Sequence, residues 1–337
     1  MSESLIIFII IFVKLSLILG ITLTLAAYMV LAERKILARM QARYGPNRVG
    51  PYGLLQPLAD LIKLVSKEDI LPAEADKTIY HIAPVIVAGT VLLTFSVVPF
   101  GGPVSVMGHV VKAPVIDLNV GVLFILALSS LGVYGVALAG WSSGSKYSLL
   151  GGIRGSAQMI SYELAMGLSI VPVVMLTGSF NLSDIVAAQS TAPFIVYSPL
   201  GFLVFLISVA AESKRIPFDL PEAENELVAG YHTEYSGMRF GLFFVGEYIN
   251  IIVLSALAVT FFLGGWHGPG PAWLSLFWFF FKAAFIAFFF IWTRATLPRF
   301  RYDQLMAFGW KLLVPLALAN VIITGALALT FGWRGGA

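Results

Sequence analysis

Long apolar runs separated by shorter polar stretches dominate the chain. The runs are about 20 residues long and continuously apolar, without the alternation typical of barrel strands. Because lipid offers no hydrogen-bonding partner to the backbone, each run that crosses a membrane has to form its own helix. The pattern therefore predicts eight transmembrane helices, at roughly 5–32, 81–100, 117–140, 157–178, 194–212, 241–263, 272–293 and 310–331.

The composition supports a membrane protein. Of the 337 residues, 58% are hydrophobic and only 12% are charged, whereas about 25% are charged in a soluble domain. The first apolar run is too long for a signal peptide, and Glu3 precedes it in place of basic residues. We therefore expect an all-α integral membrane protein that forms a single transmembrane domain over 1–337.

The basic residues are unevenly distributed among the predicted loops. Most of the 21 Lys and Arg residues follow odd-numbered spans, while the loops and ends on the opposite side hold only Lys112 and Arg334. Lys and Arg concentrate in cytoplasmic loops of membrane proteins. Both termini are therefore predicted on the outer, periplasmic side. Lys14 and Lys282 fall inside spans, and their side chains are long enough to carry the charge to the membrane surface.

The first predicted cytoplasmic loop, residues 33–80, opens with charged residues. Basic residues at a helix end are often membrane anchors, but an anchor does not need the acid Glu33 that lies among them. The apolar residues from Leu54 to Val65 then fall on one stripe of a helix, with Asp60 and Lys63 off the stripe and able to pair. The pattern predicts an amphipathic helix in the membrane surface, or alternatively one packed against a partner subunit.

The second charged loop, residues 212–240, is also predicted to face the cytoplasm. It contains six of the chain's 18 carboxylates, namely Glu212, Asp219, Glu222, Glu224, Glu226 and Glu234. A simple acidic loop would be solvated, but here the acids alternate with apolar and aromatic residues such as Phe218. Part of the loop should therefore be buried. Buried acids are costly and are usually retained for function.

Two further carboxylates lie inside predicted spans. Glu163 and Glu247 are each roughly 9–12 Å from the inner end of their helix, too deep for a short side chain to reach water. With Glu212 at the inner end of the fifth span, three helices should bring carboxylates together in the inner half of the membrane. Burial and like charge favour protonation of such groups, and chains of them form proton relays.

The chain contains no cysteine, which excludes disulfides and cysteine-bound iron–sulfur clusters. Its four histidines show no ligand spacing, so neither a metal site nor a haem held by two histidines is predicted. If the protein serves redox chemistry, the electrons should come from another subunit.

Two motifs resemble the quinone-site membrane subunit, the H-type subunit, of respiratory complex I, NADH:quinone oxidoreductase. The first is ERK at 33–35 with QARYGPNRVG at 41–50, followed by QPLAD at 56–60 and Lys63. The second contains PFDLPEAE, ELVAGY and EYS between Glu212 and Ser236. Asn225 replaces the small hydroxyl residue expected in the family but keeps a neutral polar group. The resemblance covers the whole chain, including the eight spans.

The resemblance implies a role in the quinone chamber of that complex. Quinone would enter between the first span, the amphipathic helix and the sixth span, and would be reduced by the terminal iron–sulfur cluster of a peripheral-arm subunit. Flavin and iron–sulfur clusters would belong to partner subunits, with none on this chain. Further implied partners are small membrane subunits and antiporter-like subunits, in the inner membrane of a bacterium. Nucleic acid is not an expected partner.

The resemblance also implies roles for individual residues. The quinone-site candidates are Glu33, Arg34, Arg39, Arg43, Asp60, Phe218, Glu222, Arg294 and Arg299. The candidates for a proton path toward the antiporter-like subunits are Glu163, Glu212, Asp219, Glu222, Glu224, Glu226 and Glu247. Arginines could hold these acids by bidentate contacts, and Phe218 could provide apolar wall. The pairing of arginines with acids, the order of the protons and the choice between ubiquinone and menaquinone stay open.

Two other functions fit parts of the pattern. A related subunit of a membrane-bound hydrogenase or formate-hydrogen lyase would share the acidic loop, and the subunits that copurify would distinguish it. A stand-alone ion transporter would also use buried acids. Such transporters often contain repeated halves, and this sequence shows no clear repeat.

Overall fold

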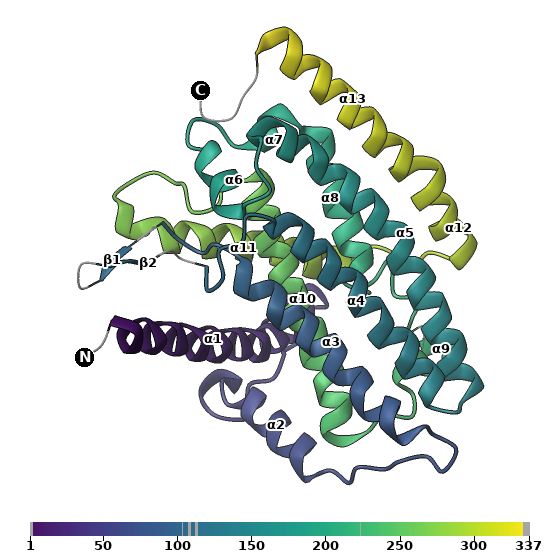
Figure 1. Cartoon of the computed structure of the whole chain (residues 1–337). Helices are drawn as coiled ribbons and strands as arrows, with labels where there is room; N and C mark the ends of the chain where they lie inside the picture. Colours follow the sequence, from purple (N-terminus) through teal and green to yellow (C-terminus); the bar gives the residue numbers. More distant parts are fainter. Residues whose placement is uncertain (1–2, 103, 107–108, 112–113, 223, 333–337) are drawn as a thin grey trace.

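Long helices lie side by side in the computed structural model of the protein (Figure 1). The structure describes residues 3–102, 104–106, 109–111, 114–222 and 224–332. Within these residues, seven helical stretches are long and apolar enough to cross a membrane. They are α1 (Glu3–Met40), α3 (Lys77–Val97), α4 (Gly121–Ser142), α5 (Lys146–Thr177), α10 (Gly237–Phe262), α11 (Ser275–Thr296) and the C-terminal stretch that ends with α13 (Val314–Phe331).

Shorter elements connect these helices. They are η1 (Pro51–Gly53), α2 (Gln56–Ser66), α6 (Leu182–Ala188), α7 (Phe194–Tyr197), α8 (Pro199–Glu212), α9 (Glu224–Leu227), η2 (Gly230–His232), η3 (Ala272–Leu274), α12 (Tyr302–Phe308) and η4 (Gly309–Leu313). The helix α1 begins and α13 ends on one side of the bundle, whereas α2, α9 and α12 lie on the other (Figure 1). We call these sides the outer end and the inner end.

The prediction of a helical membrane protein is confirmed, but the predicted span at 194–212 is interrupted. Ser198 leaves helical geometry, with φ −138° and ψ 65°, and separates α7 from α8. The cause is local, because Pro199 follows and disfavours helical geometry in the residue before it. The resulting α8 has 14 residues, fewer than any of the seven long stretches.

Other helix boundaries differ from the sequence prediction because helices continue beyond the apolar runs. The helix α1 extends to Met40 through the charged motif, and α5 begins at Lys146 instead of 157. The last span contains a π-helical turn, η4, between α12 and α13. Pro315 in the first turn of α13 has no N–H to donate, which is consistent with the altered hydrogen-bond spacing at this point.

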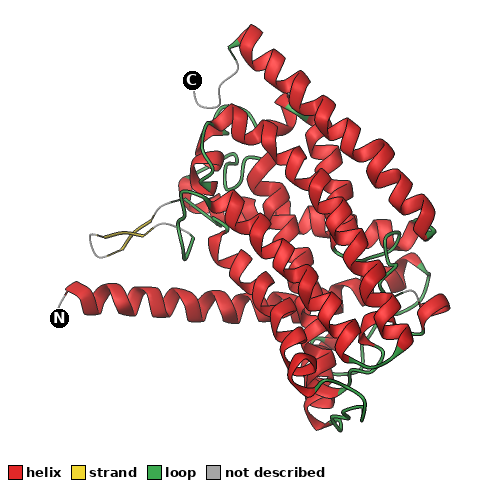
Figure 2. Cartoon of the chain, turned by 45° about the vertical axis from the view of Figure 1, so that its right-hand side comes forward, coloured by secondary structure: helices red, strands yellow, loops and turns green. Residues whose placement is uncertain are grey.

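Two short strands modify the expected all-α fold. β1 (Val104–Val106) and β2 (His109–Val111) pair antiparallel in the outer connection between α3 and α4. In Figure 2 the two strands extend away from the helices on the same side as the start of α1.

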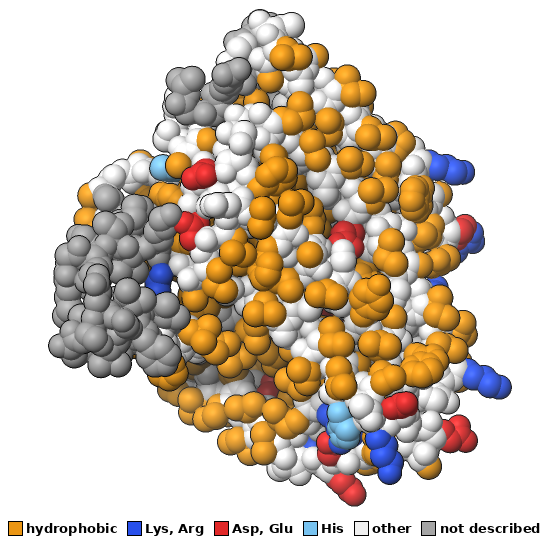
Figure 3. All heavy atoms as spheres, in the orientation of Figure 1, with side chains coloured by type: hydrophobic (Ala, Val, Ile, Leu, Met, Phe, Trp, Pro, Cys, Tyr) orange, Lys and Arg blue, Asp and Glu red, His pale blue; other side chains and the backbone are white. Residues whose placement is uncertain are grey.

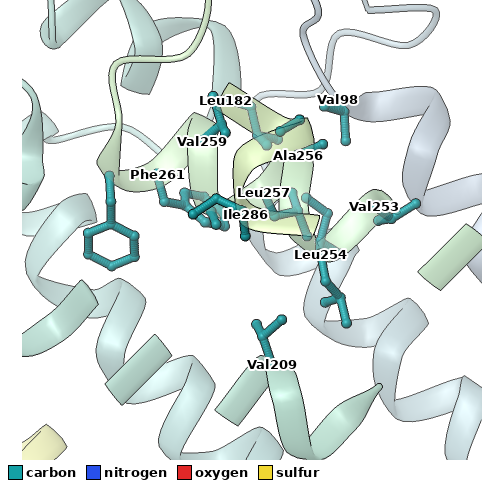
Figure 4. Close-up of a cluster of buried hydrophobic side chains, with 14 of the residues drawn as sticks. Val98, Leu182, Val209, Val253, Leu254, Ala256, Leu257, Val259, Phe261 and Ile286 are labelled. Carbon is teal, nitrogen blue, oxygen red and sulfur yellow. The ribbon is translucent and has the colours of Figure 1, made fainter. Parts of the chain in front are cut away.

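The helix α10 forms the centre of the bundle. In its apolar stretch 67% of the residues are buried, against 17% in α1. Figure 4 shows Val209 of α8, Leu254 of α10 and Ile286 of α11 in one buried cluster. This central helix also carries Glu247.

The amphipathic helix α2 exists at the predicted place, and none of its residues is buried. Its apolar stripe is open to the surroundings, with Ile62 60% and Val65 63% exposed. The expected pair of Asp60 with Lys63 is replaced by a salt bridge from Asp60 to Arg34 of α1, at 2.7 Å. Figure 3 shows hydrophobic side chains over most of one face of the molecule, with many charged groups along its lower right edge.

The two lysines inside predicted spans both donate to backbone carbonyls of the connections at the outer end. The ammonium of Lys282 donates to the carbonyl oxygens of Leu263, Gly265 and His267, at 2.7, 3.2 and 2.6 Å. The ammonium of Lys14 donates to the carbonyl of Pro114 at 3.0 Å. Backbone carbonyls of the outer connections therefore hold both ammonium groups, and the prediction that these side chains carry their charge to the membrane surface stays a prediction.

Candidate functional site

Arg215 lies at the centre of a buried ion-pair network at the inner end. Its Nη1 donates to Glu33 of α1 at 3.2 Å, and its Nε lies 2.7 Å from Glu247 of α10. Arg294 of α11 pairs with the same Glu33, whose side chain is only 4% exposed. Burial alone would lower the pKa of Arg215, but the charges of Glu247 and Glu33 raise it. Arg215 therefore stays charged and joins α1 to α10.

Aromatic contact adds to this arrangement. The guanidinium carbon of Arg215 lies 4.4 Å from the ring centroid of Tyr248, which is within the range of cation–π attraction. Buried charges are tolerated when several partners compensate their desolvation. Two carboxylates and an aromatic ring provide that compensation for Arg215.

The acidic loop supplies a second group of titratable residues. Asp219 forms a salt bridge with Arg299 at 2.8 Å, but burial raises the pKa of Asp219 to about 6 in spite of this cation. Burial also raises the pKa of Glu222, and the charges of Glu247 and Asp219 raise it further. His232 Nδ1 lies 3.9 Å from the Glu222 carboxylate. Carboxyl groups of this kind can change protonation near neutral pH.

A close approach between loop segments holds this group in place. Gly230 has φ 60°, and a Cβ there would lie 1.7 Å from the carbonyl oxygen of Pro221, so no other residue fits without a shift. Gln158 of α5 donates from Nε2 to the carbonyls of Ala211 and Phe218, at 2.8 and 2.7 Å. The amide thus fixes the end of α8 and the beginning of the loop to α5.

A pair of serines on α4 positions the deeper carboxylates. Ser129 donates to Glu212 of α8, and Ser130 donates to Glu163 of α5, both at 2.5 Å. Glu212 is 5% exposed, and its Oε2 has no hydrogen-bonding partner among the described residues. Neighbouring positions of one helix therefore bring together acids from two others. The sequence analysis expected these acids to approach one another but missed the serines.

A cavity lies beside Glu212, Lys214 and Glu247. It lies among α3, α4, α5, α8 and α10, has a volume of about 50 Å³ and is partly open to the outside. Glu212, Lys214, Tyr231 and Glu247 line it together with apolar side chains such as Met159. The cavity can hold water at its polar positions, because these groups can act as hydrogen-bonding partners.

The roles of Lys214 and Arg215 were not predicted from the sequence, where both residues count only as cytoplasmic charges. The Lys214 ammonium lies 5.2 Å from the Tyr231 ring centroid, and burial lowers the pKa of Lys214. A signal was present, since this basic pair directly follows Glu212 within an acidic loop. The sequence could not show that both side chains turn inward.

Several predicted site residues lie outside the central network. Arg39 lies over the Tyr44 ring at 5.7 Å, and Arg43 donates to Gln41 at 2.8 Å. Neither arginine contacts an acid of the loop in the described structure. Arg34 and Asp60 pair with each other between α1 and α2.

The remaining candidates differ in burial. Glu226 is 46% exposed and pairs with Arg154 of α5 at 2.7 Å. Phe218 is buried and packs against Tyr162 and Phe300, with ring centroids 5.5 and 5.6 Å away. The side chain of Glu224 lies outside the described residues. Within the part of the chain that the structure describes, no cluster of His, Asp and Glu could hold a metal ion.

Comparison with known proteins identifies the family of the chain. A family model described as NADH dehydrogenase matches residues 13–325. The chain is 68% identical over 313 residues to an H-type subunit of the NADH-quinone oxidoreductase of Geobacter metallireducens, covering 93% of this chain and 94% of that protein. It is 60% identical over 335 residues to the corresponding NADH-quinone oxidoreductase subunit of Syntrophotalea carbinolica, covering 99% and 100%.

Proposed function

The chain belongs to the NADH dehydrogenase family as a membrane subunit of the NADH-quinone oxidoreductase type, and from this we propose that it links quinone reduction to proton translocation. The observation that carries the proposal is the buried network around Arg215. It joins Glu33 of α1, whose neighbour Arg34 pairs with Asp60 of the exposed helix α2, to Glu247 at the cavity. A change of charge near Glu33 can therefore alter the electrostatic energy of Glu247 through Arg215.

The proposed membrane arrangement has eight crossings in a single transmembrane domain. Seven are the long helical stretches, and the short α8 is added to them as the fifth crossing in chain order. Its inner end faces the cytoplasm and its outer end the periplasm of a bacterial inner membrane. The concentration of basic residues at the inner end supports this orientation, and the relatives come from bacteria. The loops 33–80 and 212–240 then both face the cytoplasm.

The proposed quinone chamber lies at the inner end beside α1, α2 and α10. The exposed apolar stripe of α2 suits contact with lipid and with an apolar quinone tail. The charged wall of the chamber would come from Glu33, Arg34, Asp60 and Arg294. The wider set of proposed quinone-site residues also includes Arg39, Arg43, Phe218, Glu222 and Arg299, with Phe218 supporting the loop from its buried position.

Reduction of quinone to quinol consumes two electrons and two protons. The electrons would come from the terminal iron–sulfur cluster of a peripheral-arm subunit, and flavin would lie farther along the partner subunits. Negative charge that arrives on the quinone favours proton uptake by nearby carboxylates. This change would pass from Asp219 and Glu222 through Glu247 to Glu212 and Glu163, with Glu224 and Glu226 at the start of the path. Small membrane subunits and antiporter-like subunits would receive it.

A Glu247→Gln variant of the assembled complex in membrane vesicles tests this proposal. Loss of the carboxylate leaves Arg215 with one fewer partner, and a broken buried pair costs about 3–5 kcal/mol. We expect NADH:quinone reduction to fall by about tenfold or more, a loss that corresponds to about 1.4 kcal/mol or more on the activation barrier. Proton pumping should fall with it.

The matched control is Asp303→Asn, which removes a 64% exposed carboxylate from a surface pair. NADH oxidation with a soluble artificial electron acceptor measures the activity of the partner subunits alone. This activity should stay normal in both variants. Wild-type quinone reduction and proton pumping in Glu247→Gln would refute the proposal. Copurification with hydrogenase subunits in place of NADH-oxidising ones would favour the related hydrogenase function.

A further inference from the structure

Lys214 is a buried cation without a fixed partner. The residue is only 7% exposed, yet its ammonium makes no hydrogen bond and no salt bridge with any residue that the structure describes. Its one described contact is with the face of the Tyr231 ring, at 5.2 Å. Buried charges are normally paired, because their desolvation is costly. The isolated position of this ammonium therefore needs a functional explanation.

Three carboxylates surround Lys214 at longer range. Glu247, Glu222 and Glu212 all act on its charge, and they come from α10, the acidic loop and α8. Two of them already have closer partners, since Glu247 pairs with Arg215 and Glu212 accepts a hydrogen bond from Ser129. The ammonium thus lies between carboxylates and forms a salt bridge with none of these three.

The other elements around the cavity bring few further charges toward Lys214. From η2 come Tyr231 and His232, and Lys214 lowers the pKa of His232 in addition to the larger effect of burial. The helices α3, α4 and α5 contribute hydroxyl and apolar side chains to the cavity, such as Thr90 and Ser129. Glu163 of α5 interacts with Glu212 and lies beyond it.

The backbone and the cavity together allow the side chain to move. Lys214 has φ 54°, a left-handed conformation that is uncommon for a residue other than glycine. Its backbone is fixed at the end of α8, where Ser213 N donates to Val209 O at 2.9 Å. Its side chain lines the cavity, and a four-carbon stem without hydrogen bonds can change rotamer there.

We propose that Lys214 is a positioning residue whose ammonium moves between Glu212 on the membrane side and Glu222 and Glu247 on the loop side, and so selects which carboxyl group releases a proton. The proton passes from one carboxyl group to another carboxylate, and Lys214 keeps its own. A carboxylate close to the ammonium is favoured in its ionised form, while one that the ammonium leaves can accept a proton. The inference rests on the proposed function. Within its proton path, Lys214 is the group that determines which carboxyl group releases a proton.

Replacement of Lys214 in the full complex tests the inference. Lys214→Asn removes the cation, and asparagine tolerates the left-handed backbone at this position. Without the cation, nearby carboxyl groups should hold their protons up to higher pH. We expect the acid limb of the pH profile of quinone-linked proton pumping to move upward by about one pH unit. The number of protons pumped per electron should fall, while Lys214→Arg should restore the wild-type profile.

Lys146→Asn serves as the control, because Lys146 is an exposed lysine at the beginning of α5. A wild-type profile and stoichiometry in Lys214→Asn, with Glu247→Gln impaired, would overturn the role of Lys214 alone. Wild-type behaviour in both variants would overturn the proposed function as well. If Lys214→Asn does not assemble, Lys214→Gln keeps more of the side chain and is measured in the same way, and an unshifted profile there rejects the inference.

Discussion

Lys214 is buried and Lys282 is half-buried, and they lie near opposite ends of α10. The groups around their ammonium ions differ in chemistry. Lys282 donates to three backbone carbonyls, which fix its ammonium beside the connection that follows α10. Lys214 has no side-chain hydrogen bond within the described residues and stands among the carboxylates of Glu247, Glu222 and Glu212. A lysine at the outer end therefore stabilises a fixed backbone conformation, whereas a lysine at the inner end interacts with ionisable groups.

The neighbouring contacts follow the same division. At the outer end Gln189 accepts from the backbone N–H of Gly264 at 2.9 Å and donates to the carbonyl of Thr260 at 2.8 Å. These amide groups do not titrate, so their bonds are independent of pH. At the inner end the contacts of Arg215 depend on the ionised state of Glu33 and Glu247. Of these two sets of contacts, only the one at the inner end can change when a proton arrives.

The largest effect should come from Arg215→Gln, which removes the central cation of the inner end. Glu33 loses one of its two cations and Glu247 loses its ion pair, a change that costs about 3–5 kcal/mol for a broken buried pair. We expect little assembled complex and rapid thermal inactivation of what remains. Arg301→Gln is the control, since its side chain is 74% exposed. Normal assembly and heat resistance of Arg215→Gln would show that charge does not hold this end together.

A smaller effect is expected from Lys282→Met, which keeps much of the apolar stem and removes the ammonium. The carbonyls of Leu263, Gly265 and His267 lose their donor, at a cost of about 1–3 kcal/mol for buried groups left unsatisfied. Thermal inactivation of quinone reduction should occur at lower temperature. The pH profile of proton pumping should not change, and a shift of that profile would break the contrast with Lys214.

The smallest effect concerns His232, whose pKa is lowered to about 4, first by burial and then by Lys214. Since the unfolded side chain titrates near 6.5, the unfolded state binds a proton between these values that the folded state does not bind. Stability from this group is therefore complete above about pH 6.5 and is lost as the pH falls toward 4. His232→Asn should make thermal inactivation less dependent on pH across this range. An unchanged pH dependence would show that His232 is not buried neutral.

Much of the helical arrangement follows from the length of the apolar runs. The break at Ser198 was not predicted, because hydropathy continues through 194–212 although Pro199 marks a local conflict. The inner extension of α5 was missed for the opposite reason. Its first turns are rich in glycine and polar residues, and they form a helix that packs closely on the acidic loop, where Gly151 adjoins Tyr231.

The candidate site was predictable as a group of acids but not as a set of partners. The depth of Glu163 in its span indicated a buried carboxylate, and this required only helix geometry. The contacts of Glu33 with Arg215 and Arg294 join residues that are 182 and 261 positions apart. Such pairs depend on how helices pack, which local sequence patterns do not determine. The concentration of Lys and Arg in cytoplasmic loops also explained every arginine at this end, so the sequence did not require any of them to pair with a buried acid.

The short helix α8 has an electrical consequence. Its 14 residues rise only about 21 Å, while the hydrocarbon core is about 30 Å thick. With its first residue level with the outer boundary of the core, Glu212 at its end would lie about 9 Å inside the inner boundary. A proton on Glu212 then crosses part of the transmembrane voltage, which is worth about 2.3 kcal/mol per charge for each 100 mV across the whole membrane. Occupancy of this carboxyl group should therefore respond to the electric field of an energised membrane.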